Sequence, residues 1–177
     1  MESCGYVKAN KLTSEYIIRQ DMQKNEKAET ISIENYRNGS FDLIKNNNIK
    51  KINIKTVFNI KANKIEIKYN SEDTQSDSKI WVCISNKLLE EQINLILKEY
   101  KTRTNIINTI VNEVIENNVN GVIIDFDNIE DNEKEVVKRF MIELTPKLRE
   151  IGIDTCIVLN KNIEKNDYMN IVDYIIE

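Results

Sequence analysis

From residue 80 onward, short apolar runs alternate with stretches of helical spacing, and this order constrains the fold more than any other feature of the chain. Apolar runs lie at 80–84, 121–126, 155–159 and 174–176, and helical spacing lies at 88–100, 106–115 and 132–148. Strands that alternate with helices favour a parallel sheet with right-handed crossovers. We therefore predict an α/β fold in which 121–126 is an interior strand between 80–84 and 155–159.

The first half of the chain gives weaker signals. Residues 31–33 alternate briefly, and residues 49–69 alternate for longer, which predicts a short strand and then a hairpin-like pair. A complete eight-stranded barrel needs about 250 residues, whereas this pattern supplies no more than roughly six strands. We predict an incomplete (β/α)8 TIM-barrel-like sheet with flanking helices at 30–177, after a polar N-terminal arm at 1–29. Open sheet edges predict self-association.

The composition of the chain indicates which classes of binding partner to expect. The formal net charge is -4 and 31% of the residues are charged, which indicates a mildly acidic surface with no bias toward nucleic acid. No stretch approaches the roughly 18 apolar residues of a membrane span, so no membrane partner is expected. The start at Met1–Gly5 lacks the basic and apolar regions of a secretory signal. As written, the sequence predicts a cytoplasmic location.

Several kinds of site are excluded by residue type. The chain has no histidine, which excludes serine and cysteine triads of the usual kind. Its three cysteines have no metal-binding spacing, and Cys83 and Cys156 lie in apolar runs, where we expect buried free thiols. The acids at 127–131 lack the spacing of a calcium loop, and there is no glycine-rich phosphate loop. We therefore expect neither a metal nor a cofactor.

The segment Asn120–Ile129 contains the candidate catalytic residues. Asp125 and Asp127 are spaced i, i+2 at the end of its apolar run, so they share one face of a strand while Ile124 and Phe126 take the other. In a parallel barrel the active site lies at the carboxyl ends of the strands. Two acids at this end predict a catalytic or binding site. The alternative is a pair of solvated carboxylates that cap the following helix.

The same segment resembles the signature strand of glycoside hydrolase family 18, whose pattern is Asp-Gly-x-Asp-x-Asp-x-Glu. The spore cortex and germination branch of that family usually reads Asp-Gly-Val-Asn-Ile-Asp-Phe-Glu-Asn-Ile. Seven positions fit this branch: Gly121, Val122, Ile124, Asp125, Phe126, Asn128 and Ile129. Three positions differ, since Asn120 replaces the first Asp, Ile123 replaces an Asn or Asp, and Asp127 replaces the catalytic Glu. Flanking segments that also resemble the family lie at 5–8, 17–19, 81–86, 143–146 and 172–176.

The resemblance implies a glycosidase that acts on N-acetylglucosamine-containing glycans, either peptidoglycan of the spore cortex or chitin. In this family the acetamido group of the substrate attacks the anomeric carbon, so the protein supplies one acid and one orienting carboxylate. By position, Asp127 would be the general acid/base and Asp125 would hold the acetamido group. Asp is shorter than Glu by about 1.5 Å, one carbon–carbon bond. Weak or absent hydrolysis is therefore the expectation. Family members act at the spore or cell wall.

Two aromatic residues are candidates for sugar contacts, namely Trp81 and Tyr36. A single Trp in an apolar run is more often part of the core, so a core position is the alternative for Trp81. Three functions remain open: a divergent glycosidase, a non-catalytic glycan-binding protein, and a remnant without ligand. A competent enzyme needs Glu at position 127 and a closed barrel, and a binding protein needs only a groove with aromatic side chains. A remnant needs neither.

Overall fold

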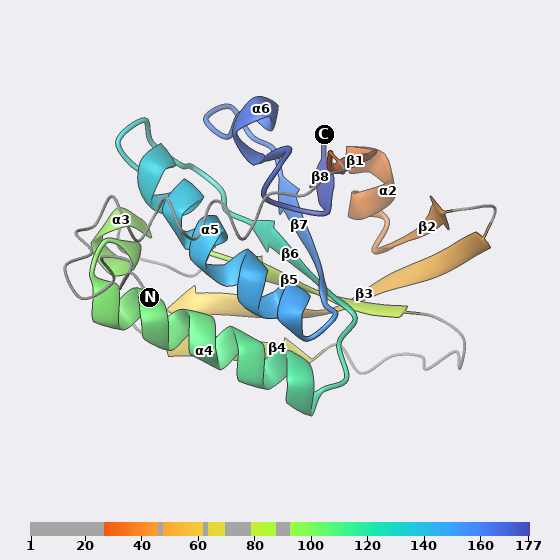
Figure 1. Cartoon of the computed structure of the whole chain (residues 1–177), viewed down its shortest axis with the longest axis horizontal. Helices are drawn as coiled ribbons and strands as arrows, with labels where there is room; N and C mark the ends of the chain where they lie inside the picture. The colour runs from red at the N-terminus through yellow and green to blue at the C-terminus, as the bar shows by residue number, and fades with distance from the viewer. Residues whose placement is uncertain (1–26, 46–47, 62–63, 70–78, 88–92) are drawn as a thin grey trace, which may run out of the picture.

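The computed structural model describes residues 27–45, 48–61, 64–69, 79–87 and 93–177 (Figure 1). The strands are β1 (Glu29–Ile31), β2 (Ser40–Lys45), β3 (Asn48–Lys61), β4 (Lys64–Tyr69), β5 (Lys79–Ser85), β6 (Gly121–Asp125), β7 (Asp154–Val158) and β8 (Tyr174–Ile176). The helices are α2 (Ile33–Arg37), α3 (Ile93–Leu97), α4 (Tyr100–Glu116), α5 (Lys134–Glu150) and α6 (Lys165–Tyr168). The N-terminal arm lies almost wholly outside these ranges.

The described strands form one sheet of eight in the order β1-β8-β7-β6-β5-β3-β2, with β4 also paired to β3. Every pair along the path from β1 to β3 is parallel, whereas β2 and β4 run antiparallel to β3. The prediction of an incomplete barrel with flanking helices is confirmed. So is the predicted place of β6, which pairs with β5 on one side and β7 on the other.

The sheet is curled, and its two faces have separate cores. Outward residues such as Val82 and Ile124 pack under α4 and α5, which lie together in front of the sheet in Figure 1. Inward residues form the second core, which contains Ile123 and the rings of Trp81 and Tyr174. These two rings lie 5.3 Å apart, although β6 and β7 separate their strands in the sheet. Only a strongly curved sheet brings such positions together.

The hairpin-like pair predicted at 49–69 is confirmed, because β3 and β4 pair antiparallel up to Lys61 and Lys64. The sequence did not predict β2, which pairs antiparallel with the first part of β3. In β2, buried Phe41 and Leu43 flank exposed Asp42, and this alternation was too short to be recognised. With β2 and β4 included, the described strands outnumber the roughly six that the pattern predicted. The predicted self-association remains a prediction.

The prediction of a strand at 31–33 was wrong about where the strand ends. Strand β1 stops at Ile31, and α2 begins at Ile33. The reason is Ser32, whose hydroxyl accepts the N–H of Glu34 at 3.3 Å and so caps the first turn. Serine is among the preferred residues for this N-cap role. The cap turns the chain away from the sheet and starts the helix that later contributes to the pocket.

Helix α5 begins after Glu133, which occupies the N-cap position and makes no capping hydrogen bond from its side chain. Its carboxylate instead accepts the N–H groups of Glu130 and Asn94 at 2.9 and 3.1 Å. Glu133 is only 2% exposed and ties the loop after β6 to the start of α3.

Pro146 lies inside α5, and the helix continues past it to Glu150. A proline inside a helix removes one backbone hydrogen bond and crowds the preceding turn. Leu144 and Leu148, on either side of Pro146, are both fully buried. Burial of a leucine side chain contributes about 1.5–3 kcal/mol. Two such side chains therefore offset the cost of the proline and hold the last turns in place.

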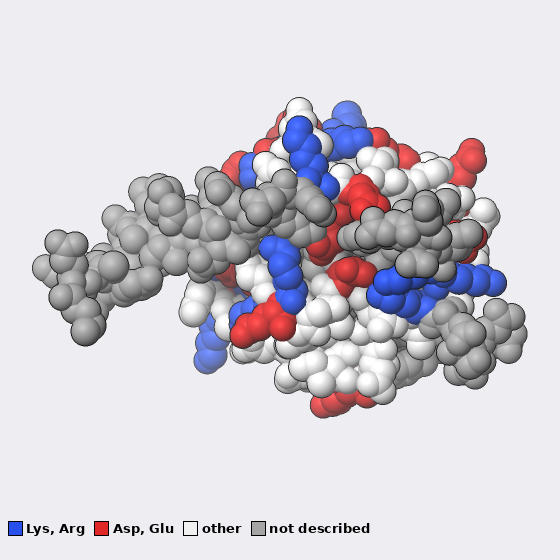
Figure 2. Space-filling model, turned by 45° about the vertical axis from the view of Figure 1, so that its right-hand side comes forward, with Lys and Arg blue, Asp and Glu red and all other residues white. Residues whose placement is uncertain are grey.

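Acidic and basic side chains are interspersed on the face shown in Figure 2, and neither sign forms a broad area there. Proteins that bind nucleic acid through their backbone phosphates present a clustered basic stripe or patch. This face has no such cluster among its described residues. Within the described ranges, none of the helices combines the length and the apolar character that a bilayer crossing requires.

Gly121 is required by the close approach of Trp81. A Cβ atom at position 121 would lie 2.4 Å from the indole ring, which is fully buried and cannot move aside. We expect Gly121→Ala to lower the free energy of unfolding by about 1–3 kcal/mol, as overpacking does in other cores. Urea denaturation followed by circular dichroism measures this change. The second substitution Trp81→Phe should recover part of the loss, and a Gly121→Ala protein as stable as the parent would contradict the packing described above.

Candidate active site

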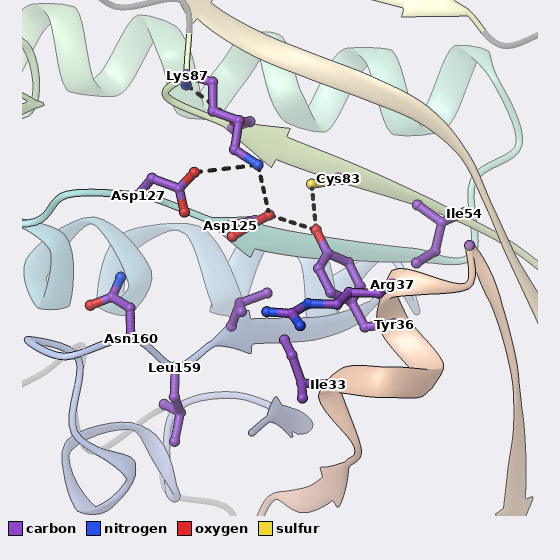
Figure 3. A pocket seen from close by; sticks show the side chains of 13 residues that line it. Ile33, Tyr36, Arg37, Ile54, Cys83, Lys87, Asp125, Asp127, Leu159 and Asn160 are labelled. Atoms are coloured by element: carbon purple, nitrogen blue, oxygen red, sulfur yellow. Dashed lines mark hydrogen bonds and ion pairs between the residues drawn. The ribbon is translucent and has the colours of Figure 1, made fainter.

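A pocket of about 570 Å³ opens where the described strands β5, β6 and β7 end (Figure 3). Its lining consists of Ile33, Tyr36, Arg37, Gly39, Ile54, Cys83, Ser85, Lys87, Asp125, Asp127, Val158, Leu159 and Asn160. The carboxyl ends of parallel strands meet at one edge of a sheet, which is where α/β proteins place their ligands. Helix α2 forms the opposite wall of the pocket. Strand β1 lies at the far edge of the curled sheet, and α2 follows β1 in the chain, so α2 lies over the carboxyl ends of the strands.

Asp125 and Asp127 both line this pocket. Asp125 is the last residue of β6, and its side chain is 12% exposed, whereas that of Asp127 is 46% exposed. Ile124 and Phe126 face the helix-covered core, as the alternation predicted. The hydroxyl of Tyr36 donates a hydrogen bond to Oδ2 of Asp125 at 2.7 Å. Three of the four predicted site residues therefore lie together in one pocket.

Trp81, the fourth predicted site residue, does not line the pocket. It is fully buried in the inner core, where Phe41 packs edge-on against its ring at a centroid distance of 5.7 Å. This is the core position that the sequence left as the alternative. Tyr36 is therefore the single aromatic side chain among the described residues that line the pocket.

Lys87 brings a cation to the two carboxylates, and sequence reasoning missed it. Its Nζ atom lies 3.3 Å from Oδ2 of Asp127 and 3.9 Å from Oδ2 of Asp125. Partial burial acts to lower the pKa of Lys87, but the two carboxylates outweigh this effect and raise that pKa, so the ammonium stays charged. Register explains its position: Ser85 pairs with Asp125, so Lys87, two residues further on, lies beside Asp127.

The hydroxyl of Tyr36 also lies 3.3 Å from Sγ of Cys83. Burial raises the pKa of the Tyr36 phenol above its usual range, and burial likewise raises the pKa of the Cys83 thiol to about 12. Both groups therefore stay protonated at neutral pH, and Tyr36 acts as a hydrogen-bond donor to Asp125. Cys83 and Cys156 are buried free thiols, as predicted.

Two asparagines hold the chain that follows β6. Asn86 makes a pair of hydrogen bonds with the backbone of Asp127, donating to its carbonyl oxygen at 2.9 Å and accepting its N–H at 2.8 Å. On the other side, Asn160 donates to the carbonyl oxygen of Phe126 at 2.6 Å. The backbone of Asp127 is thus tied to the ends of both neighbouring strands. The reach of its carboxylate is therefore set by the length and the rotamer of the side chain.

The described residues contain no group of three or more acidic or cysteine side chains that could hold a metal ion. Asp131, which follows Asp125 and Asp127 in the sequence, is 85% exposed and forms an ion pair with Lys134 at 3.0 Å. The pocket instead contains two carboxylates of unequal exposure, those of Asp125 and Asp127. Tyr36 donates a hydrogen bond to Asp125, and the ammonium of Lys87 lies close to both acids. Such a pair can orient a polar group and exchange a proton with a ligand.

No protein-family model and no curated protein matches the chain. Solved structures do match its fold. A protein described as a sporulation-specific glycosylase, ydhD from Bacillus subtilis, superposes with a TM-score of 0.61 at 15% identity, over 77% of this chain and 52% of that one. The spore cortex-lytic enzyme SleL from Bacillus megaterium superposes with a TM-score of 0.57 at 16% identity, over 67% of this chain and 32% of that one. A class V chitinase from Pseudomonas fluorescens superposes with a TM-score of 0.55 at 14% identity, over 68% of this chain and 44% of that one.

Identities of 14–16% carry information about the fold alone. The chain spans between about a third and a half of the length of these structures. Over that length, its parallel strands and covering helices have the arrangement found in a glycosylase, a cortex-lytic enzyme and a chitinase. The chain therefore has a divergent form of the chitinase-like glycoside hydrolase fold.

Proposed function

We propose that this chain binds an N-acetylated glycan in the pocket of Asp125 and Asp127, and that it is a divergent relative of the family 18 glycosidases with weak or absent hydrolytic activity. The observation that carries the proposal is the pair of carboxylates at the end of β6, on one face of the strand and open to the pocket. The hydrogen bond from Tyr36 to Asp125 supports it, because it leaves the other oxygen of that carboxylate for a ligand.

In a hydrolytic cycle the two acids would have different tasks. Asp125, oriented by Tyr36, would accept the acetamido N–H of the substrate and place its carbonyl oxygen behind the anomeric carbon. Asp127, when protonated, would give its proton to the glycosidic oxygen as the bond to the anomeric carbon breaks. The acetamido oxygen would form the new bond to that carbon. Asp127 would then take a proton from the water that opens the resulting ring.

Two features of the pocket work against this cycle. The carboxylate of Asp127 is about 1.5 Å shorter in reach than that of a glutamate, and Asn86 holds its backbone in place. The ammonium of Lys87 also competes with a substrate for both carboxylates. The second candidate function, a non-catalytic glycan-binding protein, is favoured by this ion pair, because binding does not require Asp127 to exchange a proton.

Titration calorimetry with triacetylchitotriose tests the binding that both candidates share. We expect Asp125→Ala to weaken binding at least about tenfold, since a hydrogen bond to a charged group is lost. Glu150→Gln is the matched control, because it removes one negative charge at the last residue of α5, far from the pocket, and should leave the affinity unchanged. Equal affinity in the Asp125→Ala protein, or no binding to the folded parent chain at millimolar sugar, would contradict the proposal.

A further inference from the structure

We infer that Arg37 makes this pocket selective for a sugar that carries a carboxylate group, in preference to a neutral N-acetylated sugar. The inference rests on the proposed function, because it names the substrate class of the same pocket. It assigns to Arg37 a role in recognition that is separate from the two acids on β6.

The charges of the pocket are unevenly matched. Its described lining includes four charged side chains, namely Asp125, Asp127, Lys87 and Arg37. Lys87 lies within 3.9 Å of both carboxylates and forms ion pairs with them. Arg37 pairs with no acid among the described residues, and Figure 3 shows its side chain extending from α2 into the pocket. Within the described part of the chain, a ligand therefore meets two acids that share one ammonium and a guanidinium that has no acidic partner.

A structural role in α2 does not explain why the side chain of Arg37 points into the pocket. Arg37 is in the last turn of α2, where a cation favours the negative end of the helix dipole. That benefit is obtained equally by a side chain that points to solvent. Arg37 is exposed, and Figure 3 shows its guanidinium between the side chains of Tyr36 and Ile33 at the pocket.

The chemistry of the group points to a carboxylate. A planar guanidinium matches a carboxylate with two parallel hydrogen bonds, and such charge-assisted pairs are roughly twice as strong as hydrogen bonds between neutral groups. The hydroxyl groups of a neutral sugar offer single, uncharged contacts. Neutral sugars are commonly held on aromatic rings, and the described lining contains only Tyr36, whose hydroxyl is already bonded to Asp125. Charge recognition by Arg37 is thus the main selectivity that the pocket offers.

Three probes that share one ring test the inference: N-acetylglucosamine, N-acetylmuramic acid, and the methyl ester of N-acetylmuramic acid. The ester removes the negative charge of the lactyl group and adds a single methyl group. Binding is followed by amide chemical shifts of the folded full chain at low salt. We expect the acid to bind about tenfold more tightly than the ester, and the ester to bind about as well as N-acetylglucosamine. Raised salt should reduce the preference.

Variants assign the preference to one side chain. Arg37→Gln should make the affinities for the acid and the ester equal, and Arg37→Lys should retain part of the preference because it keeps the charge but not the planar group. Lys147→Gln is the matched control: it removes a positive charge near the end of α5, where Lys147 contacts Asn108, and should change neither affinity.

Equal affinities for acid and ester in the parent chain, or a preference that survives Arg37→Gln, would overturn the inference. In either case, N-acetylglucosamine that still shifts the amides of Asp125 and Asp127 would leave the proposed function intact. Failure of all three sugars to bind would overturn both.

Discussion

Replacing Asp127 with Glu should raise the rate of chitooligosaccharide hydrolysis by about a hundredfold, from a parent rate that is very low or undetectable. The longer side chain moves the carboxyl group about 1.5 Å further into the pocket. The backbone of Asp127 cannot supply this movement, because Asn86 and the end of β5 hold it. Release of 4-methylumbelliferone from its chitobioside measures the rate with high sensitivity.

Further variants separate the causes of low activity. Asp125→Asn on the Asp127→Glu background should abolish the gained activity, since the acetamido group would lose its anionic partner. Lys87→Met on the same background should raise the rate further, because it removes the cation that competes for both carboxylates. Robust turnover by the parent chain that is lost on Asp127→Asn would mean that the shorter acid already reaches the glycosidic oxygen.

The second large effect concerns stability, and it is expected from Glu143→Ala. Arg103 is 2% exposed, and its Nε and Nη2 atoms donate to the carboxylate of Glu143 at 2.7 and 3.0 Å. Its Nη1 atom donates to the carbonyl oxygen of Leu97 at 2.6 Å. Removing the carboxylate leaves a buried guanidinium between α3, α4 and α5 without its counter-ion. We expect a loss of about 3–5 kcal/mol in the free energy of unfolding, measured by urea denaturation.

The same ion pair makes stability depend on pH. Burial acts to raise the pKa of Glu143, but the hydrogen bonds from Arg103 and Arg139 outweigh it and hold that pKa below its ordinary value of 4.5. The stabilisation from a lowered carboxylate pKa is complete above the unfolded value and is lost as the pH falls through the folded one. The Glu143→Ala protein should therefore lose less stability than the parent as the pH falls below about 4.5.

Asp131→Ala provides the exposed control for this prediction. The ion pair of Asp131 with Lys134 lies at the surface, so its loss should change the free energy of unfolding far less than Glu143→Ala does. Replacing Arg103 and Glu143 together with leucine should restore much of the stability that Glu143→Ala removes, because no unpaired charge is left. A cost below about 1 kcal/mol for Glu143→Ala itself would show that Arg103 finds another partner or reaches solvent.

The order of elements after residue 80 was predictable because each strand there is a continuous apolar run and each helix has a clear period. The interior position of β6 and the shared face of Asp125 and Asp127 follow from the same local pattern. Strand β2 and the start of α2 were missed or misplaced. In both places the structure depends on only two or three residues. At the start of α2, the hydroxyl of Ser32 caps the helix, and this cap outweighs the brief alternation of residues 31–33.

The remaining parts of the site depend on how distant segments meet, which local patterns do not contain. Lys87 reaches the two acids because β5 and β6 pair in a register that sets Ser85 opposite Asp125. Arg37 enters the pocket because β1 pairs with β8, at the far edge of a curled sheet, and so brings α2 across the strand ends. The same curvature turns Trp81 into the inner core, where Tyr174 packs against it.

The most direct test of the central claim is a crystal structure of the chain with triacetylchitotriose bound. The account predicts a sugar in the pocket at the ends of β5, β6 and β7, with its acetamido nitrogen within hydrogen-bonding distance of Asp125 and a glycosidic oxygen on the side of Asp127. Lys87 should have moved away from at least one carboxylate. A sugar bound elsewhere on the chain, with the pocket empty and Lys87 still between the two acids, would contradict the account.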